Sequence, residues 1–288
     1  KPFETYTGST HSVPDPYEWE ANGYSMLSGG PPSVGEEGFP AGRWTDDTQM
    51  TLTAARSLRN FPDATPEQYA RIAFDSYYEW YEGRGPYGTA RGVGGTIRAA
   101  MESPPYEPEI PADRSIRVGS GAAMRAAPFA LRFPLDRAID YALADTAITH
   151  PFVEAYAATT AFVSMISEKN PGKKRILRVL RDRGFRYTRI AGFLETIDGM
   201  SEVSDPEGDV ADLLSEAIGT IRYYGGGLES VREAVKAGGD TDTRAALIAQ
   251  IVVAGEGVLV VPEEDFLVIE RRDEIVDLEN ALRALKGT

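Results

Sequence analysis

Two stretches far apart in the chain share one pattern, in which a loop passes into a helix through paired aspartates and flanking threonines. The first lies at residues 44–50 and the second at residues 238–243. Each stretch leads into a run whose apolar residues recur at helical spacing. Either stretch alone is typical of a helix N-cap, where an Asp or Thr side chain accepts hydrogen bonds from the free N–H groups of the first turn.

The repetition favours a second interpretation, in which the two helix starts share a metal ion. A cap needs one side chain, whereas each stretch supplies several oxygen atoms. If the two starts meet, the carboxylates of Asp46, Asp47, Asp240 and Asp242 converge, and like charges a few ångströms apart require a compensating charge. Because the ligands are all oxygen atoms, they suit Mg²⁺, Mn²⁺ or Ca²⁺ rather than Zn²⁺. We therefore expect one divalent-metal site built from both helix starts.

The composition excludes several other kinds of site. The chain of 288 residues has no cysteine and only two histidines, His11 and His150, so disulfides, thiolate metal sites and histidine-rich zinc sites are excluded. A net charge of −14 argues against a broad nucleic-acid surface, although it allows a small anionic ligand. No apolar run reaches membrane-spanning length and no signal peptide is visible. We expect a cytoplasmic monomer without membrane association.

The rest of the chain predicts an all-α fold, a single domain at residues 1–288 that opens with a long irregular segment at 1–43. The best β-alternating run is only residues 258–261. The expected helices lie at 46–59, 66–80, 96–102, 135–148, 151–167, 172–182, 188–199, 209–223, 228–237 and 242–257, with another that begins within 119–128 and two charged amphipathic helices within 262–286.

Two further segments have the composition of ligand-binding loops. Residues 83–96 are rich in glycine and precede a helix, so their N–H groups could turn toward a phosphate. No strand precedes this loop and no Gly-Lys-Ser/Thr ending follows, which argues against a dinucleotide fingerprint or a P-loop. The small residues of 119–128 allow close backbone approach. His150 reads as a capping histidine unless the glycine-rich loop lies nearby.

Taken together, these motifs resemble those of the ADP-ribosylglycohydrolase family. Residues 44–48 and 239–243 are similar to its two metal motifs, and residues 119–128 are similar to its Gly-Asn-Gly, Met-Arg and Pro segment. Residues 149–151 resemble its Thr-His-Pro segment, and residues 2–4 resemble the segment near its N-terminus. The matches occur in the family's order and extend from residue 2 to about residue 257.

The resemblance implies a single-domain orthogonal helical bundle with a binuclear centre of two Mg²⁺, or Mn²⁺, that removes ADP-ribose from an acceptor. The implied metal ligands are Thr45, Asp46, Asp47, Asp240, Asp242 and Thr243. The implied catalytic residues are Glu4, Asp46, Asp47 and Asp242. The implied ADP-ribose contacts are Gly92, Val93, Gly94, Gly95, Thr96, Ser120, Gly121, Met124 and His150, and we expect Arg91 to help hold the diphosphate. The expected substrate is ADP-ribosyl-arginine on a protein.

Three departures from the family pattern keep alternatives open. The family's N-terminal helix is not in this sequence, so the expected domain has lost that helix or has it in a longer native chain. Ser120 replaces an asparagine, and Gly92 stands where some members carry an acidic residue. The choice of acid or base among Glu4 and the aspartates therefore stays open. The alternatives are an ADP-ribose-binding homologue with weak catalysis and a Mg²⁺-dependent hydrolase of nucleotides or small ADP-ribose derivatives.

Overall fold

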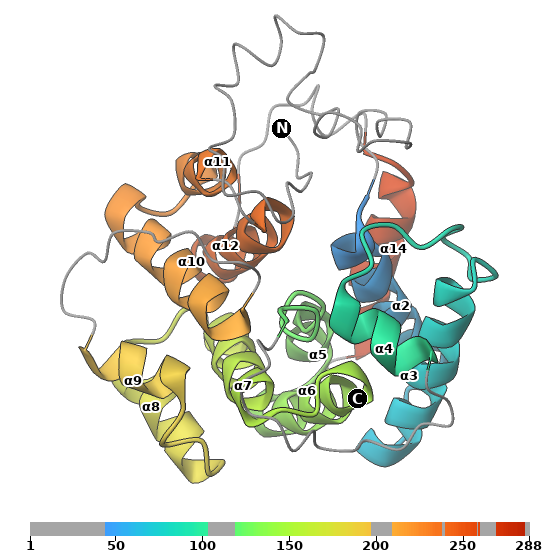
Figure 1. Ribbon diagram of the computed structural model, residues 1–288, viewed down its shortest axis with the longest axis horizontal. Helices are drawn as coiled ribbons and strands as arrows, with labels where there is room; N and C mark the ends of the chain where they lie inside the picture. Colours follow the sequence, from blue (N-terminus) through green and yellow to red (C-terminus); the bar gives the residue numbers. More distant parts are fainter. Residues whose placement is uncertain are drawn as a thin grey trace, which may run out of the picture.

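The regular structure of the described residues consists of helices. The computed structural model describes residues 44–102, 119–196, 209–237, 240–257, 259 and 269–285. Figure 1 shows the elements α2 (Asp46–Asn60), α3 (Pro66–Tyr81), α4 (Gly95–Glu102), α5 (Ala127–Arg132), α6 (Leu135–Thr149), α7 (Val153–Ser167), α8 (Lys173–Asp182), α9 (Arg189–Thr196), α10 (Val210–Tyr224), α11 (Leu228–Lys236), α12 (Thr241–Glu256) and α14 (Arg272–Leu285). The predicted all-α class is confirmed.

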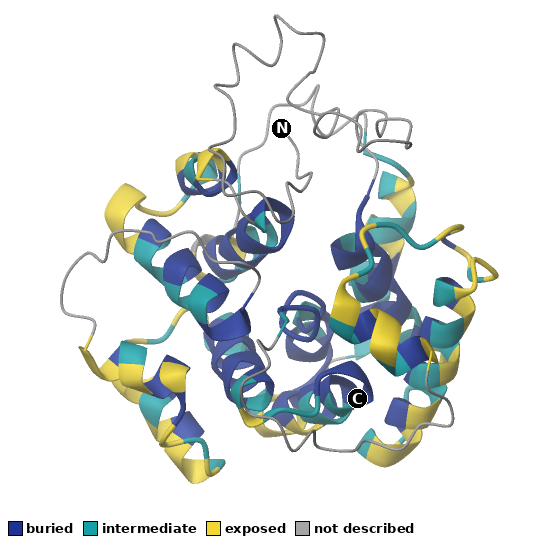
Figure 2. Cartoon of the chain, in the orientation of Figure 1, coloured by how far each residue is buried: buried dark blue, intermediate teal, exposed yellow. Residues whose placement is uncertain are grey.

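The middle of the fold is α7, which forms a hairpin with α6 and also packs against α5, α8, α9, α10 and α12. Its sequence is rich in alanine and threonine, and residues on all its sides are buried, so neighbouring helices can approach it closely. Figure 2 shows α7 built mostly of buried residues, whereas α8 carries an exposed outer face. None of the helices in the described ranges is long and apolar enough to cross a membrane.

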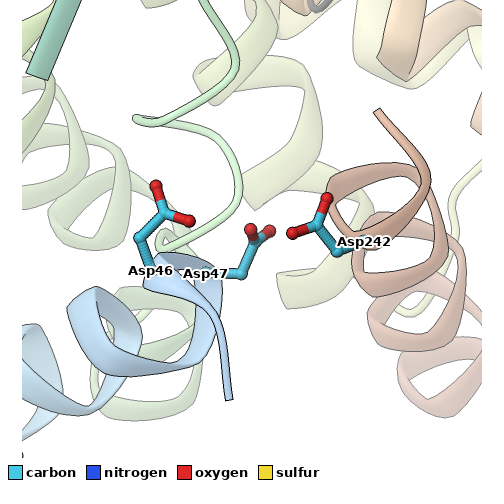
Figure 3. A group of neighbouring side chains, drawn as sticks. All are labelled: Asp46, Asp47 and Asp242. Atoms are coloured by element: carbon cyan, nitrogen blue, oxygen red, sulfur yellow. The ribbon is translucent and has the colours of Figure 1, made fainter. Parts of the chain in front are cut away.

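Two groups of helices bring the acidic stretches to the same place. On one side α2 packs against α3, α5 and α14, and on the other side α12 packs against α10, α11 and α7. Both α2 and α12 begin at an acidic stretch, and these two helix starts face each other (Figure 3). An isolated antiparallel bridge between Gly119 and Asp209 ties the segment before α5 to the start of α10.

The observed helices follow the expected ranges closely, with one difference. The run at 119–128 begins as turns, and its helix starts only at Ala127, next to Pro128. Proline fits a first helical turn but ends a hydrogen-bonded run that reaches it from before, which explains the late start. The predictions for residues 1–43, for 197–199 and for the first of the two helices expected within 262–286 lie outside the described residues, as does that for 258–261 except at Leu259.

Candidate metal centre

Three aspartates from the two helix starts lie together. Asp46 and Asp47 open α2, and Asp242 lies in the first turn of α12. Each can offer a carboxylate oxygen so that the three oxygens lie within 4.8 Å of one another. Figure 3 shows that Asp47 and Asp242 extend toward each other from their two helices. The expected meeting of the two stretches is thus present, and it brings together residues that are 195 positions apart in the chain, from Asp47 to Asp242.

These helix starts do not use their side chains as caps. Thr45 is the N-cap residue of α2 and Asp240 that of α12, and neither side chain makes a capping hydrogen bond. Elsewhere the chain does cap its helices in the ordinary way, since Thr65 forms a capping box on α3 and Asp209 accepts from two N–H groups of α10. The side chains of Thr45 and Asp240 are therefore not used for capping, although Oδ1 of Asp242 does accept the backbone N–H of Thr243 at 3.0 Å.

The carboxyl groups of the centre are buried beside one another, and this changes their pKa values. Burial and, next, the Asp240 carboxylate raise the pKa of Asp47 from 3.8 to about 7. Burial and the charge of Asp47 raise the pKa of Asp46 well above its usual range, and the same two causes raise that of Asp242. Without a cation, ionising this group of carboxyls works against folding.

A divalent cation fits the donors that these residues present. The Oδ1 atom of Asp47 is buried and accepts no hydrogen bond within the part of the chain that the structure describes. A buried oxygen without a partner is costly, and a bound ion would satisfy it. Hydroxyl and carboxylate oxygens are ligands of Mg²⁺ and Mn²⁺, so the donor set agrees with the sequence-based expectation.

The remaining predicted metal ligands lie around this group. Thr45 and Thr243 are buried, and Asp240 is half-buried. Ser120 donates to Oδ2 of Asp240 at 3.1 Å and also lies 3.5 Å from the hydroxyl of Thr243. The serine that replaces the family's asparagine therefore contacts two predicted ligands, and it ties the 119–121 segment to the start of α12.

The glycine loop approaches the same group from the side of α2. Gly92 has a φ of +70°, and a Cβ at this position would lie 2.8 Å from Oδ1 of Asp46. No other residue type fits that approach without a shift. Val93 packs against the hydrophobic core. A Cβ at Gly94 or Gly95 would meet nothing within 4 Å, so of these three glycines only Gly92 needs its small size for contact with the centre.

His150 is buried against the segment 119–121 and lies close to the start of α4. A Cβ added to Gly119 would lie 3.2 Å from Nε2 of His150 and 3.4 Å from the hydroxyl of Thr96, so the histidine and the glycine loop are neighbours. At Gly121 a Cβ would lie 2.8 Å from the His150 ring. Burial, together with the Arg125 guanidinium, lowers the pKa of His150 to about 3, so the imidazole is neutral near pH 7.

Buried ion pairs that the sequence did not indicate hold these segments in place. Arg125 donates to Asp145 at 2.6 Å, to the carbonyl of Gly121 and to the hydroxyl of Thr149, whose oxygen lies 2.7 Å from Nδ1 of His150. The adjacent Met124 has a buried side chain, and its carbonyl accepts long hydrogen bonds, at 3.4 Å, from α2 and from α12.

A second buried pair fixes the start of α12. Arg244, directly after Thr243, lies 3.0 Å from the carboxylate of Glu216 on α10 and donates to the carbonyl of Ala234 on α11. In the sequence, only the position of Arg244 beside the acidic stretch points to this pair, because its partner Glu216 lies on another helix.

Arg91 and Glu4 are two further residues whose expected roles stay predictions. Arg91 makes a two-point ion pair with Glu270, at 2.8 and 3.2 Å, and donates to the carbonyl of Trp44. In this arrangement its guanidinium is engaged by the protein, and its expected role toward a diphosphate stays a prediction. Glu4 lies outside the described residues, so its place at the centre also stays a prediction.

Comparison with known proteins identifies a family and similar solved structures. The ADP-ribosylglycohydrolase family model matches residues 5–288, which is nearly the whole chain. Among solved structures the chain is similar to one described as an ADP-ribosylglycohydrolase-related protein complex, with 25% sequence identity, a TM-score of 0.64, and coverage of 86% of this chain and 83% of that one. No curated protein matches the sequence.

Proposed function

The chain belongs to the ADP-ribosylglycohydrolase family, a family of glycosyl hydrolases that act on ADP-ribose conjugates, and we propose that it removes ADP-ribose from arginine in a Mg²⁺- or Mn²⁺-dependent reaction. The observation that carries the metal dependence is the buried Oδ1 atom of Asp47, which finds no hydrogen-bond partner among the described residues and lies in a group of three buried carboxyls. Such a group needs positive charge to stay ionised in a folded protein.

The proposed ligands of a binuclear centre are Thr45, Asp46, Asp47, Asp240, Asp242 and Thr243. When bound, divalent cations would supply Lewis-acid polarisation and offset negative charge near the glycosidic bond. The contacts of Ser120 with Asp240 and Thr243 support this set, because a side chain that orients ligands tunes how they bind a metal. The buried pair of Arg244 and Glu216 would keep the start of α12 in position as substrate binds.

The chain's own residues would bind and orient the substrate around this centre. The N–H groups at the start of α4 point out of a helix N-terminus, which favours a diphosphate, and the glycine loop leads directly to them. His150 is neutral, and its Nε2 lies against Gly119 and Gly121. Its ring could therefore donate or accept a hydrogen bond with ribose without adding charge.

The proton transfers are assigned to carboxylates. As the bond to the acceptor breaks, positive charge develops at the anomeric carbon of the ribose, and a nearby carboxylate stabilises it. Glu4, Asp46, Asp47 and Asp242 are the proposed catalytic residues, and one of them would remove a proton from the attacking water while the acceptor nitrogen gains one. A cytoplasmic location and a monomeric state, expected from the sequence, stay predictions.

The test is release of ADP-ribose from ADP-ribosyl-arginine, measured with Mg²⁺, with Mn²⁺ and with EDTA. We expect metal-dependent release by the wild type and none by Asp47→Ala or Asp242→Ala, while Asp136→Ala, an exposed aspartate on α6, serves as the matched control. Unchanged turnover in either of the first two variants would contradict the metal assignment.

Three companion measurements separate the alternatives that the sequence leaves open. Tight ADP-ribose binding in calorimetry without release from any acceptor would identify a binding homologue. Release of inorganic phosphate from ADP-ribose or nucleoside diphosphates would identify a nucleotide hydrolase. Release from ADP-ribosyl-serine, but not from ADP-ribosyl-arginine, would keep the reaction class and replace the acceptor.

A further inference from the structure

Gln49 is a buried side chain whose amide is fully hydrogen-bonded at both ends. It lies on α2, almost one turn after Asp46, and is 0% exposed. Its Nε2 donates to the carbonyls of Tyr87 and Thr89, each at 3.1 Å, and its Oε1 accepts from the indole N–H of Trp80 at 3.0 Å and from the backbone N–H of Arg91 at 3.1 Å. These four bonds are all that a glutamine amide can make with two donors and two acceptor sites.

Three of the four partners belong to one loop, the stretch 87–91, which Gly92 directly follows. The loop has few backbone hydrogen bonds of its own, since the only one between described residues in this stretch joins the N–H of Gly88 to Gly85. Gln49 therefore supplies the bonds that regular secondary structure would otherwise provide. Leaving such buried or partly buried groups without partners is costly, so the loop conformation depends on this side chain.

The loop and the metal centre are in contact where the loop ends. Gly92 lies against Asp46, close enough that a Cβ would come within 2.8 Å of Oδ1. Asp46 and Gln49 are on the same helix, so one rigid element carries both the proposed metal ligand and the side chain that holds the loop. The distance between the carboxylate and the loop N–H groups is then fixed by α2 itself.

We infer that Gln49 is a positioning residue, which holds the glycine loop in register with the metal centre so that its N–H groups meet the diphosphate of an ADP-ribosyl substrate. The inference rests on the proposed function for the identity of that ligand. It does not make Gln49 catalytic, because the side chain contacts loop backbone and Trp80 in place of reacting atoms.

The outer side of the loop has separate attachments, so loss of Gln49 should loosen the loop without detaching it. Arg91 pairs with Glu270, and Arg271 donates to the carbonyl of Pro86 and lies over the ring of Tyr87. These contacts come from the segment before α14 and remain when Gln49 is replaced.

The test compares Gln49→Met with Thr53→Val by amide hydrogen exchange and steady-state kinetics. Methionine keeps the length and shape of glutamine but loses all four hydrogen bonds. Thr53 lies on the same helix, is also buried and, among the described residues, donates to the carbonyl of Gln49, so it controls for loss of a buried polar group in α2. Exchange is measured on the protein alone and decides the inference even if the wild type shows no glycohydrolase activity.

We expect Gln49→Met to raise amide exchange about tenfold or more at Arg91, whose N–H donates to Gln49, and at Gly88, whose N–H donates to Gly85, consistent with the loss of hydrogen bonds worth about 1 kcal/mol each. The KM for an ADP-ribosyl substrate should rise about tenfold with kcat nearly unchanged, since a tenfold change corresponds to about 1.4 kcal/mol of binding. Thr53→Val should change neither quantity.

Gln49→Glu gives a second readout if Gln49→Met does not fold. A carboxylate still accepts from Trp80 and from the N–H of Arg91 but repels the two carbonyls, so exchange should rise at Gly88 and stay slow at Arg91. Unchanged loop exchange in the glutamine variants, a fall in kcat at constant KM, or the same changes in Thr53→Val would overturn the inference.

Discussion

Replacing Asp47 by asparagine should stabilise the metal-free protein and remove its response to metal. Asp47 is buried in the acidic group, and burial and, next, the charge of the Asp240 carboxylate raise its pKa from 3.8 to about 7. A carboxyl whose pKa is raised in the folded state loses its proton less easily there than in the unfolded chain. Above the unfolded-state pKa, this difference lowers the free energy of unfolding. Asparagine keeps the size of the side chain and has no charge to ionise.

The magnitude follows from the two pKa values. At about 1.4 kcal/mol for each pKa unit, ionised Asp47 costs the folded protein about 4 kcal/mol above pH 7. Below about pH 4 the carboxyl is protonated in both states and the cost disappears. Asp47→Asn should therefore raise the free energy of unfolding in EDTA by up to about 4 kcal/mol at about pH 8 and by little at about pH 4.

The assay is urea unfolding of both proteins, with EDTA and with Mn²⁺. Metal that binds only the folded state adds about 2.7 kcal/mol at 100 times its Kd, which the wild type should gain and the variant should lack. An Asp47→Asn protein that is less stable than the wild type in EDTA at about pH 8 would refute the reasoning, because it would show that the folded protein already stabilises this carboxylate.

Asp145→Asn is the matched control, since it makes the same chemical change at a buried aspartate of opposite character. Asp145 accepts from Arg125 at 2.6 Å and from the hydroxyls of Tyr69 and Tyr77 at 3.0 and 2.8 Å. Removing one partner of a buried ion pair costs about 3–5 kcal/mol, so this variant should be destabilised to the same extent with and without metal.

Three further predictions test other parts of the centre. The free energy of unfolding of the metal-free wild type should fall as the pH rises from about 4 to about 7, the range set by the raised pKa of Asp47, and saturating Mn²⁺ should remove most of this fall in urea titrations. Gly92→Ala, at a φ of +70° and against Asp46, should cost about 1–3 kcal/mol in thermal or urea unfolding and lower kcat/KM, whereas alanine at Gly94, where a Cβ would meet nothing within 4 Å, should leave the stability unchanged. Ser120→Ala, which removes the hydroxyl that contacts Asp240 and Thr243, should weaken Mn²⁺ binding about tenfold in calorimetry; equal affinities would exclude a role in orienting the ligands.

The helices could be predicted from the sequence because the signals that define them are local. Apolar spacing and capping residues placed α2, α3, α6 and α12 within a few residues of their observed bounds. The start of α5 was less predictable, because the residues before Pro128 are small and fit a turn as well as a helix. Local patterns also favoured the two acidic helix starts as partners, which the structure bears out.

The supporting residues of the centre could not be predicted in this way. Gln49 reads as one polar residue in an amphipathic helix, and its four partners lie 31 to 42 positions further along the chain. The pairs that Arg125 makes with Asp145, and Arg244 with Glu216, likewise depend on which helices pack together. Buried charge is only tolerated with such a partner, so an arginine in a helix that is otherwise apolar predicts that a partner exists without identifying it.

Asp209 and Asp240 show why a helix start of this kind needs more than its own sequence to interpret. Both are aspartates at an N-cap, and both are followed by an aspartate within the first turn. Asp209 bonds to two N–H groups of its own helix, whereas Asp240 makes no such bond, and its carboxylate receives the hydroxyl of Ser120 from another segment. What separates the two is the second acidic stretch at Asp46 and Asp47. Asp209 caps its own helix and has the guanidinium of Arg189 at 2.9 Å to offset its charge, whereas carboxylates brought together from two helices can be offset by one shared cation.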